Sequence, residues 1–389
     1  MIPVYLDWAA TAIPDRELIE SFDSVASRVY GNPSSRHSAG REAAALLSES
    51  RRRLAASLNT SPESVYFTSG GTESNNMVFL SMLAHEQRGG VVITGIEHAS
   101  VYEPAQMLKR LGFPLRIVAA RTDGSVRAED IESALDPETR LVSVMYVNNE
   151  TGAIQPVAEV ARAIRAFERR SGARIHFHCD CVQAFGKIPV DCAELGADSF
   201  ALSAHKIGAP RGAGVLVVRR PLSPLSVGGG QESGMRPGTE NLAAIYAMAE
   251  GAERRCRELR HTLTNARARK AELVRALNAI EGCHLNPPEA GEHPDRFTPY
   301  ILNASFPPLP GEVLVRVMSD RGYAISTGSA CSSRDKERSR VLASMGVDEK
   351  LARSAIRISI GYSTTQEEIS SFAGSLEQEV QAWSRPLRR

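Results

Sequence analysis

Residues 200–206 of the chain read Phe-Ala-Leu-Ser-Ala-His-Lys, a short apolar run that predicts a buried β-strand with Lys206 directly after its end. Residues 175–183, Ile-His-Phe-His-Cys-Asp-Cys-Val-Gln, predict the strand before it, which carries Asp180. A pyridoxal phosphate site needs a lysine that forms a Schiff base with the aldehyde and a carboxylate that meets the pyridinium nitrogen. Lys206 and Asp180 therefore predict such a site.

The region around this pair, from about residue 64 to 218, alternates β-branched runs with helical patterns. The runs are residues 65–67, 91–93, 115–118, 141–147, 175–178, 200–202 and 215–218. Such alternation predicts an α/β fold with a mostly parallel seven-stranded sheet and helices on both faces. Apolar residues at helical spacing after Gly40 predict an amphipathic helix ahead of the sheet.

The C-terminal part has a different pattern. A region rich in Ala, Glu and Arg, from about residue 240 to 279, predicts a long helix that contains the domain boundary. A helix over 313–318, strands over 323–326 and 356–360, and a final helix predict a smaller α+β domain. We expect a large cofactor-binding domain over 15–255 and a small domain over 256–389, joined by the N-terminal segment 1–14.

Composition narrows the class of protein. The 389 residues are 42% hydrophobic, enough for a sizeable core and two domains. The formal net charge of +1 gives no general attraction to nucleic acid or an anionic membrane, so neither is expected as a direct partner. The start of the chain does not resemble a signal peptide, and no apolar run approaches the roughly 18 residues of a membrane span. We therefore expect a cytoplasmic protein.

The six cysteines, at positions 179, 181, 192, 256, 283 and 331, are too sparse for a disulfide framework. Cys331 lies in a loop of small residues, 326–333, which precedes a charged run with several basic residues. Nearby basic residues favour the nucleophilic thiolate, so Cys331 is a candidate nucleophile. The alternative is an incidental surface cysteine.

Residues 68–74, Thr-Ser-Gly-Gly-Thr-Glu-Ser, follow a predicted strand and open a predicted helix. The backbone N–H groups around Gly71 and the hydroxyl of Thr72 would suit a phosphate at the helix N-terminus. The alternative is an ordinary strand-to-helix turn capped by Ser or Thr. Ser203 and His205, just before Lys206, would supply further phosphate donors and favour the first interpretation.

Three polar residues follow or lie on other predicted strands. His98 would stack on an aromatic cofactor and move protons, or be a solvated loop histidine. Asn149 would bind a substrate carboxylate or a ring hydroxyl, or belong to a turn built by Asn and Gly. Arg357 would bind a substrate carboxylate with its planar guanidinium, or form an ion pair.

A rival interpretation uses the strand that carries Asp180. Because side chains alternate across a strand, His176, His178 and Asp180 share one face and would suit a transition metal. This interpretation predicts a metal-dependent hydrolase, but it explains neither Lys206 nor Gln183. Partly buried histidines without a ligand are the plainer alternative, and we expect no metal site.

In their order along the chain, ten features resemble the cysteine desulfurases of the NifS and IscS type. They are residues 5–11, 31–37, 70–73, 97–98, 147–150, 180–183, 203–206 and 236–241, together with Cys331 and Arg357. These enzymes are class-V members of the aspartate-aminotransferase fold, that is, fold-type I pyridoxal phosphate enzymes. The resemblance extends over almost the whole chain.

The resemblance implies roles for the cofactor-binding residues. Lys206 would be the Schiff-base lysine, Asp180 the partner of the pyridinium nitrogen, and Gln183 the partner of the ring hydroxyl. His98 would stack on the ring as a catalytic residue. The phosphate would be held by Gly71, Thr72, Ser203 and His205. Thr239 would reach the phosphate of the neighbouring subunit, which implies a homodimer with shared active sites.

The resemblance also implies the reaction. Asn149, which also belongs to the expected cofactor site, and Arg357 would bind the carboxylate of L-cysteine, and Cys331 would take its sulfur as a persulfide with release of L-alanine. The sulfur would pass to an acceptor protein such as an iron-sulfur scaffold, for iron-sulfur cluster assembly or tRNA thiolation. A selenocysteine lyase or an aminotransferase of the same fold is the alternative. Cys181 stands where many relatives carry alanine, which would put an extra thiol near the ring.

Overall fold

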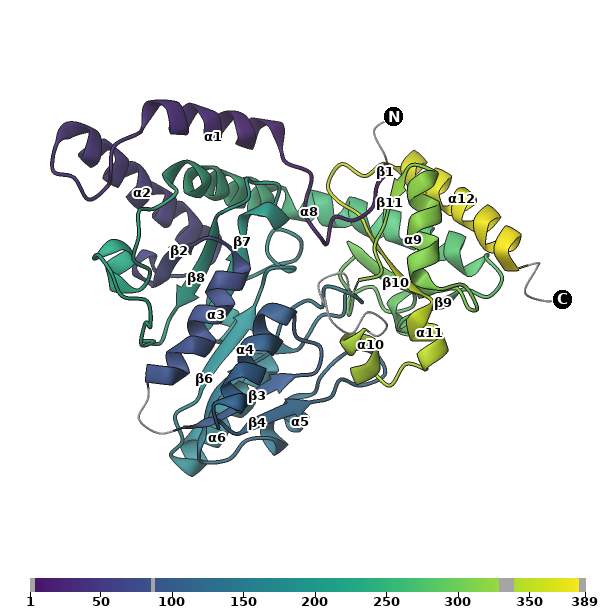
Figure 1. The fold of residues 1–389 in the computed structure, drawn as a ribbon, viewed down its shortest axis with the longest axis horizontal. Helices are drawn as coiled ribbons and strands as arrows, with labels where there is room; N and C mark the ends of the chain where they lie inside the picture. The colour runs from purple at the N-terminus through teal and green to yellow at the C-terminus, as the bar shows by residue number, and fades with distance from the viewer. Residues whose placement is uncertain (1–3, 85–87, 329–338, 385–389) are drawn as a thin grey trace.

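The computed structural model describes residues 4–84, 88–328 and 339–384 (Figure 1). Its central sheet contains β2 (Val65–Thr68), β3 (Gly90–Thr94), β4 (Leu115–Val118), β5 (Thr139–Ser143), β6 (His176–Asp180), β7 (Ser199–Ser203) and β8 (Gly214–Val218). The strand order is β2-β8-β7-β6-β5-β3-β4. Strand β8 is antiparallel to both neighbours, and the other neighbouring pairs are parallel. The predicted mostly parallel, seven-stranded sheet is confirmed.

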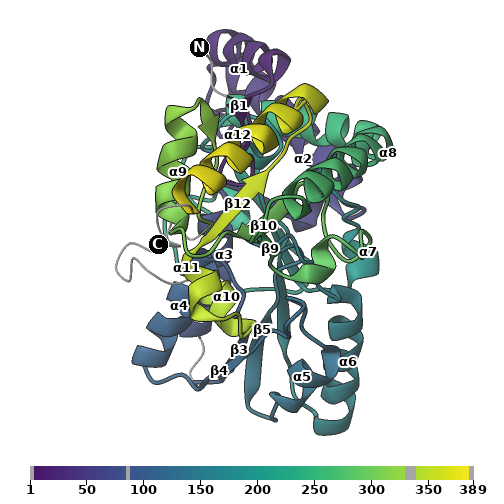
Figure 2. The same cartoon turned by 90° about the vertical axis from the view of Figure 1, so that its right-hand side faces the viewer.

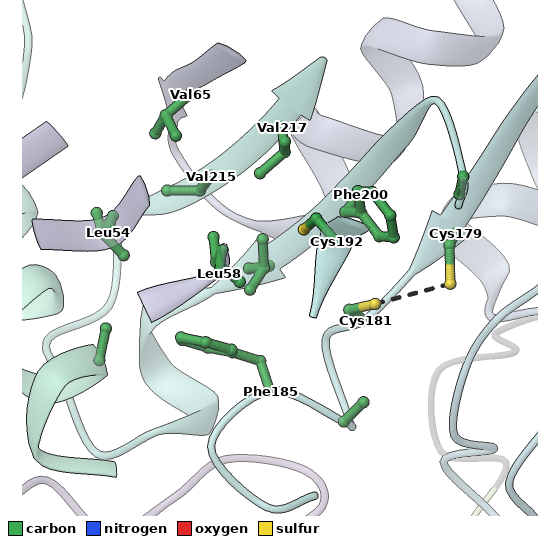
Figure 3. Packing of buried hydrophobic residues seen from close by; sticks show 14 of the residues in the cluster. Leu54, Leu58, Val65, Cys179, Cys181, Phe185, Cys192, Phe200, Val215 and Val217 are labelled. Atoms are coloured by element: carbon green, nitrogen blue, oxygen red, sulfur yellow. Dashed lines mark hydrogen bonds between the residues drawn. The ribbon is translucent and has the colours of Figure 1, made fainter. Parts of the chain in front are cut away.

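Helices cover both faces of the sheet because alternate strand residues are apolar on each side. On one face, Val91 and Ile93 pack with α3 (Gly71–Ser81) and α4 (Ala99–Arg110). On the other, Val92 and Phe177 belong to the large core reached by α5 (Ala128–Ser133) and α6 (Val157–Ser171). Figure 3 shows part of this second core, where Phe200, Val215 and Val217 pack near the buried cysteines.

Two N-terminal helices complete that core. Helix α1 is Arg16–Arg28 and α2 is Ser38–Ser57. Helix α2 buries Ala43, Leu47 and Leu54, so the amphipathic helix predicted after Gly40 is confirmed. Both helices pack along α8 (Leu242–Asn278), which extends from the large sheet to the C-terminal part of the molecule (Figures 1 and 2).

The C-terminal part is built around a second sheet. Strands β9 (His284–Leu285), β10 (Ile301–Ser305) and β12 (Ala355–Ser359) pair antiparallel in the order β12-β10-β9. The helices are α9 (Gly311–Asp320), α10 (Arg340–Ser344), α11 (Glu349–Arg353) and α12 (Gln366–Ser384). The predicted strand over 323–326 is shorter, because β11 covers only Tyr323–Ala324 and Ser326 makes an isolated bridge to Arg357.

The N-terminal segment packs with this second part. Strand β1 (Val4–Tyr5) pairs in parallel with β11, and Leu6 lies in the same buried cluster as Leu277 of α8 and Phe372 of α12. We propose a large domain over 15–255 and a small domain over 256–389 that includes segment 1–14, because the two parts have separate apolar cores. The segment brings residues 7–11 to the carboxyl ends of β6 and β7, where they meet Gln183, His205 and Lys206.

Candidate active site

A cavity of about 370 Å³ lies where the large sheet, the N-terminal segment and the small domain meet. Ten of the residues singled out in the sequence line it: Gly71, Thr72, His98, Asn149, Asp180, Gln183, Ser203, His205, Lys206 and Arg357. Thr239 is exposed and does not line this cavity. Cys331 lies outside the described residues. The tertiary structure thus brings together side chains from β6, β7, β12 and several loops.

One end of the cavity is suited to an anion. Helix α3 begins at Gly71, and its N-cap Gly70 offers no side-chain cap, so the predicted alternative of a Ser- or Thr-capped turn is not what forms. A Cβ on Gly71 would lie 2.5 Å from Val182 Cγ2, so only glycine lets the helix begin this close to the chain after β6. Ser203 is buried beside this turn. The helix N-terminus therefore offers N–H groups and a favourable dipole to a phosphate.

His205 lies at the same end. Its Nδ1 is 3.0 Å from Thr11 Oγ1. Burial, with the positive charges of Lys206, Lys187 and Arg211, lowers the pKa of His205 to about 4. The imidazole is therefore neutral near pH 7 and carries one N–H donor.

Lys206 is held at the bottom of the cavity by the N-terminal segment. Its Nζ donates to the carbonyls of Ala9 at 2.6 Å and Ala10 at 2.7 Å. Gln183 Nε2 donates to the same Ala9 carbonyl at 2.8 Å. The other end of the Gln183 amide, Oε1, accepts from Lys187 Nζ at 2.8 Å. A carbonyl only accepts, so the Ala9 carbonyl fixes which way the Gln183 amide faces, and Lys187 holds its other end.

Lys187 is a residue that the sequence reading missed. Its side chain is buried, and burial followed by the charges of Lys206 and Arg357 lowers its pKa to about 7. The sequence offered one signal for Lys187, its position four residues after Gln183. That signal was not enough, because the chain there forms turns after β6, and the sequence pattern does not show where a side chain in such a turn points.

Asp180, at the end of β6, accepts two hydrogen bonds. Its Oδ1 accepts from the backbone N–H of Val182 at 2.9 Å, and its Oδ2 accepts from Asn75 Nδ2 at 2.7 Å. These two hydrogen bonds fix the orientation of the carboxylate. Asn75 on α3 is fully buried and was also missed, because an asparagine inside a helix carries no sequence pattern of its own.

His98 is the N-cap of α4, where its Nδ1 accepts from the backbone N–H of Ser100 at 3.1 Å. Burial lowers the pKa of His98, opposed by the charge of Asp180. The ring is therefore neutral near pH 7, and it lines the cavity rather than lying free in solvent.

Arg357 enters the cavity from β12 of the small domain. Its Nη1 donates to the Asn149 carbonyl at 3.0 Å, and its Nη2 pairs with Asp7 Oδ1 at 2.7 Å. The ion pair named as an alternative at the sequence level does form. It lies inside the cavity, since Asp7, Asn149 and Arg357 all line it, so it does not remove Arg357 from the site.

Further ionisable residues at the small-domain side were not foreseen. Glu97 is buried, and burial together with the charge of Asp180 raises its pKa to about 8. Burial also raises the pKa of Glu150, whose Oε2 accepts from Ser339 Oγ at 2.5 Å. Arg340 lines the cavity, donates to the Glu97 carbonyl at 2.5 Å and stacks on Tyr102. Burial therefore disfavours the charged form of both acids.

The geometry does not form the rival metal site. His176 Nε2 and His178 Nδ1 each lie 2.8 Å from Ser199 Oγ, and His178 Nε2 lies 2.9 Å from Asn75 Oδ1. Burial lowers the pKa of both imidazoles to about 3. Within the described ranges, no three His, Cys, Asp or Glu side chains are placed to hold a metal ion.

Cys181 lies in the apolar core and not at the cavity. It is fully buried, its Sγ is 3.7 Å from Cys179 Sγ, and it does not line the cavity (Figure 3). The expectation of an extra thiol near the ring therefore does not hold, because the side chain after β6 points into the core that contains Phe200.

The donor set fits a phosphorylated pyridine aldehyde. An uncapped helix start with hydroxyls nearby suits the phosphate, an amine suits the aldehyde, an acceptor-only carboxylate suits a protonated ring nitrogen, and a neutral imidazole suits the ring face. The residues in these places are Gly71, Thr72, Ser203, His205, Lys206, Asp180 and His98.

This fold and site are those of a class-V aminotransferase: the profile of that family, described as "Aminotransferase class-V", matches residues 4–372, and the chain belongs to the family. Within it the chain belongs with the cysteine desulfurases. It is 35% identical to the cysteine desulfurase IscS of Dictyoglomus turgidum, over 97% of this chain and 94% of that protein.

Solved structures of related proteins support the same family membership. A structure described as a NifS-like protein superposes with a TM-score of 0.89 at 34% identity, covering 97% of this chain and 99% of the other. A second, described as SspA in complex with cysteine, superposes with a TM-score of 0.78 at 31% identity, covering 92% and 98%. Among the described residues, no helix has the length and the apolar character that a membrane span requires.

Proposed function

We propose that the chain binds pyridoxal phosphate through Lys206 and converts L-cysteine into L-alanine, passing the sulfur to Cys331 as a persulfide. The observation that carries the proposal is the single cavity in which Lys206, Asp180, the uncapped start of α3 and Arg357 converge. The solved relative described with cysteine supports the choice of substrate.

The residues that would hold the cofactor divide by the part of it that they suit. The phosphate would lie at the start of α3, with Thr72, Ser203 and His205. The ring would lie between His98 and the strand end that carries Asp180, with Gln183 at its hydroxyl. When bound, pyridoxal phosphate withdraws electrons from the substrate Cα.

The protein's own groups would bind the substrate and move its protons. Arg357, fixed by Asp7 and the Asn149 carbonyl, would bind the substrate carboxylate. Lys206 Nζ would take the proton from Cα, since the Ala9 and Ala10 carbonyls already hold it at the bottom of the cavity. The small domain and the N-terminal segment would limit the entry of water.

The sulfur step balances without an added oxidant or reductant. The Cys331 thiolate would attack the substrate sulfur, so that an S–S bond forms and the Cβ–S bond breaks. The electron pair of that bond goes to Cβ, which gains a proton and becomes the methyl group of alanine. Cys331 is left as a persulfide. Of the protons of the two thiols, one ends on Cβ and the other remains on the persulfide. The persulfide then needs a thiol-bearing acceptor.

The wider role rests on the relatives. Since they are named IscS and NifS-like, we propose that the sulfur serves iron-sulfur cluster assembly or tRNA thiolation through an acceptor protein. We also propose a cytoplasmic homodimer in which the exposed Thr239 reaches the phosphate bound by the neighbouring subunit.

The test compares the wild type with Lys206→Ala and Cys331→Ser. Alanine formation from cysteine with pyridoxal phosphate should be lost in Lys206→Ala and reduced at least about a thousandfold in Cys331→Ser. Cys256→Ser, at an exposed cysteine, should behave as the wild type. Full alanine formation by Cys331→Ser would refute the persulfide step. Alanine from selenocysteine only would favour the selenocysteine lyase.

A further inference from the structure

Asn75 joins the two residues that would contact the cofactor ring from different elements. It is fully buried on α3 and does not line the cavity. Its Nδ2 donates to Asp180 Oδ2 at 2.7 Å and to Ser100 Oγ at 2.8 Å, and its Oδ1 lies 2.9 Å from His178 Nε2. One amide therefore uses both of its N–H groups and its oxygen.

The orientation of this amide follows from Asp180. A carboxylate only accepts hydrogen bonds, so the NH₂ end of Asn75 must face it and the oxygen must face His178. His178 therefore carries its proton on Nε2. Its Nδ1 then accepts from the Ser199 hydroxyl, 2.8 Å away. The low pKa of His178, about 3 because of burial, agrees with this neutral form.

The Asn75 amide is also connected to His98, through the hydroxyl of Ser100. Ser100 Oγ accepts from Asn75, so its own proton is available to His98 Nδ1, 2.8 Å away. The backbone N–H of Ser100 donates to the same nitrogen. His98 Nδ1 therefore carries no proton, and the single proton of the neutral ring is on Nε2.

We infer that Asn75 is a positioning residue for the reaction: it holds Asp180 as an acceptor for the ring nitrogen and, through the Ser100 hydroxyl, adds to the Ser100 backbone N–H in keeping the proton of His98 on Nε2. The inference rests on the proposed pyridoxal phosphate site. Asn75 itself would touch neither cofactor nor substrate; it orients the Asp180 carboxylate and acts on the tautomer of His98, and both of these groups would contact the ring.

The charged groups around Asp180 and His98 determine how a substitution at Asn75 will change the pH dependence of the site. Asp180, Lys206, Arg340 and Arg357 act on the pKa of His98, and Asp180 also acts on that of buried Glu97. Asn75→Asp has the same shape but places a second carboxyl 2.7 Å from Asp180 Oδ2. Two such groups cannot both be ionised, and one shared proton cannot serve both Asp180 and Ser100.

The test follows the visible absorption of the enzyme loaded with pyridoxal phosphate as a function of pH. For Asn75→Asp we expect the midpoint of the titration to rise by about one pH unit, because sharing a proton weakens the Asp180 carboxylate as the partner of the ring nitrogen. We expect kcat to fall at least about tenfold, with KM for cysteine changed less than about threefold.

Asn286→Asp is the matched control. Asn286 is also buried, and its Nδ2 also donates two hydrogen bonds, to Asn303 Oδ1 at 2.8 Å and Ser305 Oγ at 2.7 Å, but in the small domain. It should lose thermal stability as Asn75→Asp does and keep the wild-type midpoint. If both variants have the wild-type midpoint and equal activity, Asn75 is only a packing residue and the inference is wrong.

If Asn75→Asp does not fold, Ser100→Ala tests whether the hydrogen bonds from Asn75 to His98 contribute to the reaction. It removes the hydroxyl between Asn75 and His98 and leaves the bond to Asp180, so kcat should fall about threefold to tenfold with an unchanged midpoint. Activity equal to that of the wild type would overturn the inference. Wild-type protein that gains no visible absorption with pyridoxal phosphate would instead refute the proposed function, before any variant is made.

Discussion

The carboxylate of Asp7 lies 2.7 Å from Arg357 Nη2, across 350 positions of sequence. Arg357 also donates to the Asn149 carbonyl, so one guanidinium connects the N-terminal segment, the large domain and β12. Its side chain is only 5% exposed. The proposed substrate-binding group is therefore oriented before any substrate arrives, because both contacts restrict its rotation.

Arg357→Lys should raise KM for cysteine about tenfold or more, because a lysine cannot contact Asp7, Asn149 and a carboxylate with one planar group. The measurement is initial rate against cysteine concentration. Arg353→Lys, at an exposed arginine that pairs with Glu349, is the control and should leave KM unchanged. An unchanged KM in Arg357→Lys would show that the carboxylate binds elsewhere.

Gly71→Ala should lower the affinity for pyridoxal phosphate at least about tenfold, because the added Cβ meets Val182 and must displace the start of α3. Equilibrium dialysis of the apoprotein measures this affinity. Gly374→Ala, inside α12 with nothing within 4 Å of an added Cβ, is the control. It should keep the affinity and stabilise the fold by about 0.5–1 kcal/mol. Equal affinities in the two variants would contradict the phosphate site.

Lys187→Met should also weaken cofactor binding, by about tenfold, because Gln183 Oε1 loses its buried donor and the amide is then held only at its Nε2 end, by the Ala9 carbonyl. Lys270→Met also removes a buried lysine, whose Nζ donates to the Thr298 carbonyl; neither residue lines the cavity. Its affinity for the cofactor should equal that of the wild type. The same dialysis experiment tests the pair, and a matching loss in both would point to a general loss of stability.

The burial of Lys270 also leads us to predict that the free energy of unfolding depends on pH. Burial lowers its pKa from 10.5 to about 7 in the folded protein, so the unfolded chain binds more protons between these values. The contribution of this group to stability therefore rises with pH through that window and is lowest below about pH 7. Lys270→Met should gain more in unfolding free energy over the wild type near pH 7 than near pH 9.5 in urea denaturation. A pH-independent difference would show that Lys270 is not buried as described.

The sequence determined the sheet and much of the cavity lining. Most of the strands are short apolar runs that become buried on both faces, and the partly exposed edge strand β4 is β-branched as well, so β2 to β8 were predictable from local pattern. The residues just beyond strand ends were predictable for the same reason, since parallel strands place their carboxyl ends together. Asp180, Ser203 and Lys206 follow this rule.

Only the tertiary structure decided which polar partners hold those residues. Asn75, Asp7 and Lys187 contact the candidate site through hydrogen bonds and ion pairs that span up to 350 positions or lie inside a tight turn. Such contacts depend on the exact approach of separate elements and leave no periodic trace in the sequence. The same holds for Cys181, whose position next to Asp180 did not reveal that its side chain faces the core. Local pattern thus determined the elements, and long-range packing decided the charge, orientation and tautomer of the groups between them.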